Sequence, residues 1–154
     1  MWIQPGLRAV SIAVSGANSV SGMVEPNDRV DVLGTYSFPS KTSAGEMETV
    51  TLTLLQDVTV LATGQNLAKQ EFMRNRNAMR STSYSTVTLE VKPREAEFLV
   101  FAQQAQGRLT LVLRNSADST YETTLPEINF KYLETKLPEM NLERQQKIRR
   151  KPGI

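Results

Sequence analysis

The sequence predicts a mostly β (α+β) fold, in which a compact sheet carries one packed amphipathic helix and ends in a loosely structured C-terminal tail. Apolar and polar residues alternate with a period of two in several separate segments, as expected of half-buried strands. A single segment has a convincing helical period, and clusters of Gly, Ser, Asn and Pro separate the pieces. The 154 residues suit one domain, or at most two small ones.

The first two predicted strands, residues 10–14 and 30–34, flank an interval rich in turn-forming residues. Asp28 and Asp31 carry the oxygen ligands that a hard cation prefers. An acid directly after Pro-Asn more often bonds nearby backbone N–H groups in a turn. We therefore expect a turn here and no metal site.

Three further strands are predicted at residues 50–55, 58–62 and 85–91. Gln56 and Asp57 interrupt the alternation between the first two of them, which indicates a bulge or a change of register. Residues 35–48 contain several Ser residues with Pro and Gly, so their composition predicts a surface loop.

The predicted helix runs from about Pro93 to Gln106 and is followed by a strand at residues 109–114. Pro93 suits the first helical position, whereas Lys92 is a poor N-cap residue. Gly107 is expected to end the helix. The apolar stripe expected to pack on the sheet consists of Phe98, Phe101, Ala102 and Ala105, widened by Leu99 and Val100.

We assign residues 1–114 to the β domain and residues 115–154 to an extension. The expected core comprises Val10, Ile12, Val30, Val32, Leu54, Val58, Val60, Leu89, Leu99, Leu111 and Leu113. In the extension, Ile128, Phe130 and Tyr132 alternate and predict an edge strand. Residues 139–151 are interpreted as a marginal helix or a disordered tail.

The composition excludes much of enzyme chemistry, because the chain contains no His and no Cys. Catalytic triads, cysteine nucleophiles, His or Cys metal sites and disulfides are therefore ruled out. Glu90, Glu95 and Glu97 are close enough in sequence for paired-acid catalysis. A strand position and the first turn of a helix explain them better. We expect a protein without catalytic residues, metal or cofactor.

The charge is concentrated in one segment. The whole chain has 18 Lys and Arg against 16 Asp and Glu, a net charge of +2. Residues 64–84 alone have a net charge of +3, and they are interpreted as a mobile loop or a short helix. This segment contains one acid, Glu71, and four basic residues, Lys69, Arg74, Arg76 and Arg80. A solvated loop is the ordinary interpretation, and contact with an acidic protein face is the functional one; the small net charge argues against nucleic acid.

No run of about 18 apolar residues exists that would span a membrane, and the first residues lack the pattern of a signal peptide. We therefore expect either a cytoplasmic protein or a piece of a longer chain. The basic residues 144–151 suit an acidic lipid or protein surface, or a solubilising overhang.

Several motifs in order resemble the CpaB/RcpC family of Flp (Tad) pilus assembly. They are GLRAVSI at residues 6–12, SGMVEPNDRVDVL at 21–33, TLLQDVTVLA at 53–62 and TVTLEV at 86–91, followed by the helix and LTLVLR at 109–114. Asn27 stands where the family usually has Gly, and Lys92 where it often has Thr. Beyond Asn115 no resemblance is found.

The resemblance implies a β-clip-like domain of SAF type in a type IV pilus or Tad secretion machine. Such a domain is expected to be a non-catalytic periplasmic assembly module that docks on the outer-membrane secretin or on other pilus subunits, and homo-oligomers are compatible with that role. Its anchor would be an N-terminal membrane helix absent from this chain. SAF domains also suggest the alternative of a module that binds glycans or peptidoglycan, or of a periplasmic chaperone.

Overall fold

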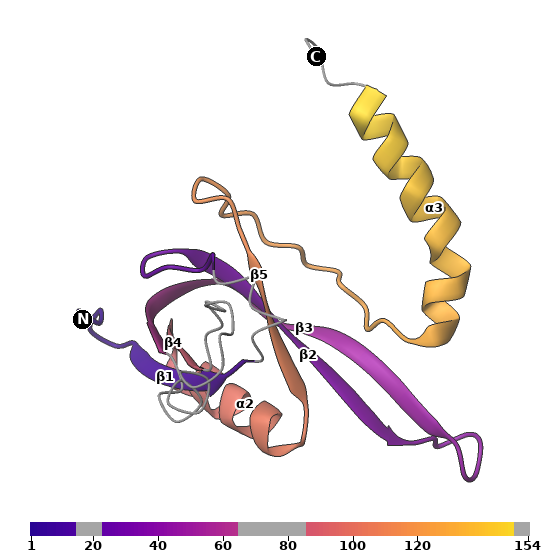
Figure 1. The fold of residues 1–154 in the computed structure, drawn as a ribbon, viewed down its shortest axis with the longest axis horizontal. Coiled ribbons are helices and arrows are strands. Elements are labelled where there is room, and N and C mark those ends of the chain that lie inside the picture. Colours follow the sequence, from indigo (N-terminus) through magenta and orange to yellow (C-terminus); the bar gives the residue numbers. More distant parts are fainter. Residues whose placement is uncertain (15–22, 65–85, 150–154) are drawn as a thin grey trace, which may run out of the picture.

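The structure, a computed structural model, describes residues 1–14, 23–64 and 86–149 (Figure 1). Five antiparallel strands form one sheet in the order β1-β4-β3-β2-β5. The strands are β1 (Arg8–Ala13), β2 (Arg29–Pro39), β3 (Met47–Gly64), β4 (Thr86–Val91) and β5 (Arg108–Leu113), and the helices are α2 (Pro93–Gln104) and α3 (Phe130–Arg149). The predicted mostly β fold is confirmed.

β2 and β3 extend beyond the rest of the sheet as a two-stranded arm, visible at the lower right of Figure 1. The predicted loop at residues 35–48 is shorter than expected: β2 continues to Pro39 and β3 begins at Met47, so only residues 40–46 connect the two strands. Cross-strand hydroxyl contacts explain the difference: Thr35 contacts Thr51 at 2.8 Å, and Ser37 contacts Thr49 at 3.0 Å. Ser and Thr residues that suggest a loop by composition here stabilise a ladder.

The predicted bulge at Gln56 and Asp57 is confirmed within one continuous β3 strand. The β2–β3 register shifts on both sides of Val32. Asp57 has a φ angle of 59°, in the left-handed region. Asp tolerates that region because its short side chain bonds the local backbone. The bulge turns the Asp57 side chain toward Arg29 of β2 and toward Arg114, which follows β5.

The core lies between the sheet and α2. Most of the predicted core residues are buried, while Val10, Leu54 and Leu113 are partly buried and pack against the same cluster. α2 contacts both edge strands, β1 and β5. The helix therefore closes the sheet between its two edges, as Figure 1 shows.

α2 buries a different face from the one predicted. Leu99 and Ala102 point into the core, whereas Phe98 and Phe101 are 62% and 73% exposed. The apolar run is too wide for one face to bury entirely. Small residues such as Ala102 let the helix lie close to the strands, and the two phenylalanine side chains are left outside.

Both ends of α2 depend on neighbouring residues. Lys92 is the N-cap residue and its side chain makes no cap, but its N–H donates to Glu95 Oε2 at 2.7 Å. After the helix, Gln106 rather than Gly107 adopts the left-handed conformation, with a φ of 58°. Gly107 is needed for another reason, because a Cβ there would overlap the ring of Tyr36.

The chain beyond β5 runs alongside β3 and then forms α3, which stands apart from the sheet (Figure 1). The predicted edge strand is wrong for Phe130 and Tyr132, which lie in the helix; only Ile128 pairs, as an isolated bridge to Thr51. Asn129 explains the early start of α3, since its side chain accepts the N–H of Tyr132 at 2.8 Å. Neither α2 nor α3 has the length and apolarity to cross a membrane.

Candidate functional site

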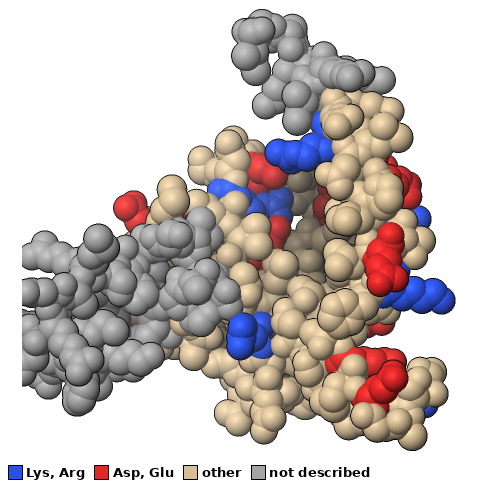
Figure 2. Space-filling view, turned by 45° about the vertical axis from the view of Figure 1, so that its right-hand side comes forward, with Lys and Arg blue, Asp and Glu red and all other residues tan. Residues whose placement is uncertain are grey.

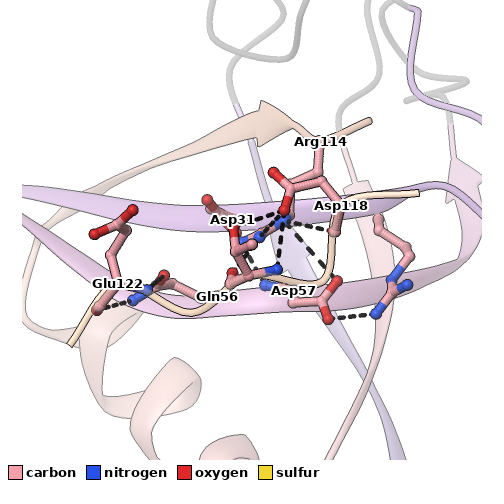
Figure 3. Close-up of polar contacts among 8 residues, drawn as sticks. Asp31, Gln56, Asp57, Arg114, Asp118 and Glu122 are labelled. Atoms are coloured by element: carbon pink, nitrogen blue, oxygen red, sulfur yellow. Dashed lines mark hydrogen bonds and ion pairs between the residues drawn. The ribbon is translucent and has the colours of Figure 1, made fainter. Parts of the chain in front are cut away.

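Five charged side chains, from β2, from β3 and from the turn that follows β5, gather at the β3 bulge (Figure 3). We call this group the polar cluster. It comprises Arg29 and Asp31 of β2, Asp57 of β3, and Arg114 and Asp118 after β5. The bulge and the end of β5 bring together residues that are far apart in the sequence.

Arg114 is the centre of the polar cluster, and its side chain is only 7% exposed. Its Nη1 donates to Asp31 Oδ1 at 2.8 Å, and its Nη2 lies 3.3 Å from Asp118 Oδ1. Arg29 pairs with Asp57, whose backbone N–H donates to Asp31 Oδ1 at 2.9 Å. Asp57 Oδ1 is buried without a hydrogen bond, 4.0 Å from Arg114 Nε.

Local hydrogen bonds favour the charged forms of Arg114 and Asp118 within the polar cluster. The hydrogen bond from Arg114 to Asp31 raises the pKa of the guanidinium. Hydrogen bonds from the Thr120 hydroxyl and backbone N–H lower the pKa of Asp118. These pairs hold the chain after β5 against the sheet, so the polar cluster is a structural clamp.

Beyond the clamp, residues 115–129, which we call the connecting segment, meet β3 at two points. The Gln56 side chain accepts the N–H of Glu122 and donates to its carbonyl, both at 3.0 Å. Thr51 and Ile128 exchange two backbone hydrogen bonds of 2.9 Å. Every residue from Tyr121 to Asn129 is nevertheless exposed. Hydrogen bonds, and little apolar burial, hold this segment.

The acids singled out from the sequence have separate structural partners. Asp28 accepts the N–H of Glu25 at 2.8 Å and closes the predicted turn. Glu90 accepts the N–H of Gln4 at 3.0 Å, and Glu97 pairs with Arg94 at 2.6 Å. Glu95 accepts the N–H of the N-cap residue Lys92. Each of the three glutamates therefore has its own partner, and no two of them form a carboxylate pair. No cluster of three metal-ligating side chains occurs in the described ranges.

The four predicted partner contacts, Lys69, Arg74, Arg76 and Arg80, lie outside the described residues. The described chain offers another candidate contact, the outer face of α2. A shallow hollow there is lined by Arg94, Glu97, Phe98 and Phe101. The Arg94 guanidinium lies 6.0 Å from the centre of the Phe98 ring, at the outer limit of a cation–π contact.

The sequence did not predict this face, because both phenylalanines were placed in the apolar stripe expected to pack on the sheet. The sequence did contain a signal for this face: residues 98–102 are all apolar, which is more than one helical stripe can bury. Two neighbouring exposed aromatic rings are typical of a protein-binding surface. The outer face of α2 can therefore supply apolar contact area flanked by one positive and one negative charge.

Comparison with known proteins identifies one family. The family model described as Flp pilus assembly protein RcpC/CpaB matches residues 1–114, in agreement with the resemblance of the motifs. No curated protein and no solved structure matches the chain.

Proposed function

This chain belongs to the RcpC/CpaB family of Flp pilus assembly proteins, and we propose that it is a non-catalytic periplasmic module that docks on the outer-membrane secretin or on neighbouring pilus subunits. We place it on the periplasmic side of the inner membrane, tethered by a helix outside this sequence. A role in pilus assembly follows from the family, whereas the mode of docking is our proposal.

The observation that carries the docking proposal is the exposed pair Phe98 and Phe101 on α2. Folding leaves these rings in water although Leu99, between them, is completely buried. Exposed aromatics contribute most to affinity when a partner covers them. The adjacent Arg94 and Glu97 give such a contact a polar rim.

The basic residues Lys69, Arg74, Arg76 and Arg80 are proposed as a second, electrostatic part of the contact. Positive charge is concentrated on these residues, whereas the remainder of the chain is slightly acidic. This distribution favours an acidic face on the partner. Charges of this kind accelerate association and lose their effect as salt screens them.

The test measures binding of the 154-residue chain to the periplasmic region of the secretin, at low and at moderate salt. Phe98→Ser with Phe101→Ser is expected to weaken binding at both salt concentrations. Charge reversal at Arg74, Arg76 and Arg80 is expected to slow association mainly at low salt. Val112→Ser, at an exposed position of β5, serves as the control.

If both multiple variants bind as well as the parent, docking through these surfaces is refuted. Melting temperatures of all variants must match that of the parent, because loss of folding alone abolishes binding.

The exposed rings also favour an alternative, a module that binds glycans or peptidoglycan, because aromatic faces stack on sugar rings. Sedimentation with purified peptidoglycan distinguishes the two functions. The glycan-binding function would replace the docking proposal if the parent sediments with peptidoglycan and does not bind the secretin. The Phe98→Ser and Phe101→Ser variant must then fail to sediment with peptidoglycan. A SAF-type chaperone role would instead appear as suppressed aggregation of unfolded pilus subunits.

A further inference from the structure

α3 is a helix of 20 residues that has little to pack against. It makes no extensive contact with any other described element. Its described side chains, Phe130 to Lys147, are exposed except for the half-buried Tyr132 and Lys136. Charged side chains of both signs lie on this side of the molecule (Figure 2).

A helix of this composition needs a partner to be stable. In proteins, most of the stability of a helix comes from packing of its amphipathic face and not from the helix propensity of its residues. Pro138 lies inside α3, where a proline removes a backbone hydrogen bond and costs about 3 kcal/mol or more. Burial of apolar side chains against another surface is the usual source of the missing stability.

α3 carries an apolar stripe suited to such burial. The stripe consists of Phe130, Leu133, Leu137 and Met140, and all four side chains are exposed. Their spacing of three, four and three residues corresponds to the a and d positions of a coiled coil. Pro138 falls outside these positions, so it does not interrupt the stripe.

The charges beside the stripe select the direction of pairing. In the same heptad, Lys136 and Glu143 occupy successive g positions, which face each other in an antiparallel helix pair. Two copies of α3 arranged in this way form the contact between Lys136 and Glu143 twice, by symmetry. In a parallel pair, Lys136 faces the uncharged Asn141 instead.

The antiparallel arrangement also fits the ends of the stripe. With Leu137 opposite Met140 at the centre, Leu133 lies opposite Arg144 and Phe130 opposite Lys147. The long aliphatic stems of Arg and Lys cover apolar side chains while their charges stay in water. Within one chain Lys136 Nζ lies 3.3 Å from Glu139. A solvent-accessible pair of this kind is weak enough to exchange partners.

From these features we propose that α3 is a self-association element, which pairs with α3 of a second copy of this chain as an antiparallel two-helix coiled coil. The partner is therefore identical, and the contact joins two molecules through their C-terminal helices. This inference is independent of docking on the secretin, which uses α2 and residues 64–84.

The first experiment measures the mass of the 154-residue chain in solution by light scattering and sedimentation over a range of concentrations. The parent is expected to form a dimer, and Leu137→Glu a monomer. Leu142→Glu is the matched control: Leu142 is 57% exposed and Leu137 50% exposed, but Leu142 lies on the opposite face of α3. A monomeric parent, or equal behaviour of the two variants, overturns the proposal.

The second experiment tests the direction of pairing. Lys136→Glu and Glu143→Lys are each expected to weaken the dimer about tenfold, because two like-charge contacts replace two attractive ones. An equimolar mixture of the two variants is expected to restore the parent affinity, since every 136–143 contact then joins opposite charges. Circular dichroism checks that each variant stays folded.

Failure of the mixture to restore dimerisation overturns the antiparallel arrangement, because a parallel pair places neither charge opposite the other. If each single variant dimerises more weakly and the mixture regains the parent affinity, contacts within one helix cannot explain the result.

Discussion

At the scale of single residues, the Tyr36 ring explains why two positions in this chain are glycine. The ring lies over Gly34 and Gly107, and its hydroxyl donates to the carbonyl of Ala102 at 3.4 Å. An added Cβ at Gly34 would lie 2.8 Å from the ring. Burial also raises the pKa of the Tyr36 hydroxyl. The ring thus ties β2 to the end of α2.

Two neighbouring substitutions after α2 are expected to have opposite effects. Gly107→Ala should destabilise the fold by about 1–3 kcal/mol, because the methyl group overlaps the Tyr36 ring. Gln106→Gly should stabilise it by about 0.5–1 kcal/mol, because the φ of 58° favours Gly. Urea denaturation measures both. Equal effects of the two variants would show that the left-handed position is not at Gln106.

Lys92→Thr is expected to stabilise the chain by about 0.5–1 kcal/mol. The Lys92 backbone already has the extended conformation of an N-cap residue, and Glu95 already accepts its N–H. A threonine hydroxyl would complete the capping box from the other side. Lys92→Ala controls for loss of the lysine side chain, and a denaturation midpoint no higher for Thr than for Ala contradicts the prediction.

At the scale of elements, α2 divides its apolar residues between the core and the exterior. Leu99→Ala is expected to cost about 2–5 kcal/mol, because it leaves a cavity under the helix. Phe98→Ala removes a larger side chain but should cost less than about 0.5 kcal/mol, because that ring is exposed. Thermal or urea unfolding of the pair tests the assignment. A larger loss for Phe98→Ala would mean that α2 is turned the other way.

The turn after β5 gives the fold a dependence on acid. Hydrogen bonds from Thr120 hold the pKa of Asp118 below its ordinary value of 3.8, so ionised Asp118 stabilises the folded state above that value. This contribution is lost as the pH falls through the lowered pKa. Asp118→Asn keeps the acceptor oxygen but has no charge.

Near neutral pH, the urea midpoint of the parent is therefore expected to be higher than that of Asp118→Asn. The difference between the two midpoints should shrink below about pH 4. Midpoints measured in a series of buffers at constant ionic strength test the sign. A difference that grows in acid contradicts it.

At the scale of the whole molecule, the polar cluster and Gln56 determine where the chain goes after the sheet. Arg114 binds the backbone of Asp118 and Thr120, and Gln56 then binds Glu122. These contacts direct the connecting segment along β3 and carry α3 away from the core (Figure 1). The position of α3 therefore depends on a few polar contacts.

Gln56→Ala is expected to release the middle of the connecting segment without unfolding the sheet. The variant loses both hydrogen bonds to Glu122, while the exposed neighbours bury little apolar surface. Proteolysis near the exposed Tyr121 should become faster, and the melting temperature should change little. Gln104→Ala, at an exposed position of α2, is the control.

Much of the sheet follows from the sequence alone. Alternation placed β1, β4 and β5 and the apolar residues that face the core, because the period of a strand is local. The interrupted alternation at Gln56 and Asp57 located the bulge, and the ordered motifs identified the family later matched over residues 1–114.

Other features arise only in the folded chain. Which face of α2 is buried depends on how closely the strands approach it, and Ala102 rather than Phe101 satisfies that distance. The length of the β2–β3 arm depends on hydroxyl pairs across strands, such as Thr35 with Thr51.

The polar cluster shows the same division most clearly. The sequence determined that Asp31, Asp57 and Arg114 exist and that a bulge lies near one of them. Only the tertiary structure decided that they meet, because ion pairs between residues distant in sequence depend on strand order and register. Local periodicity carries no information about which strands become neighbours. The burial of the Arg114 side chain, which lets it clamp the chain, comes from all the neighbouring strands together.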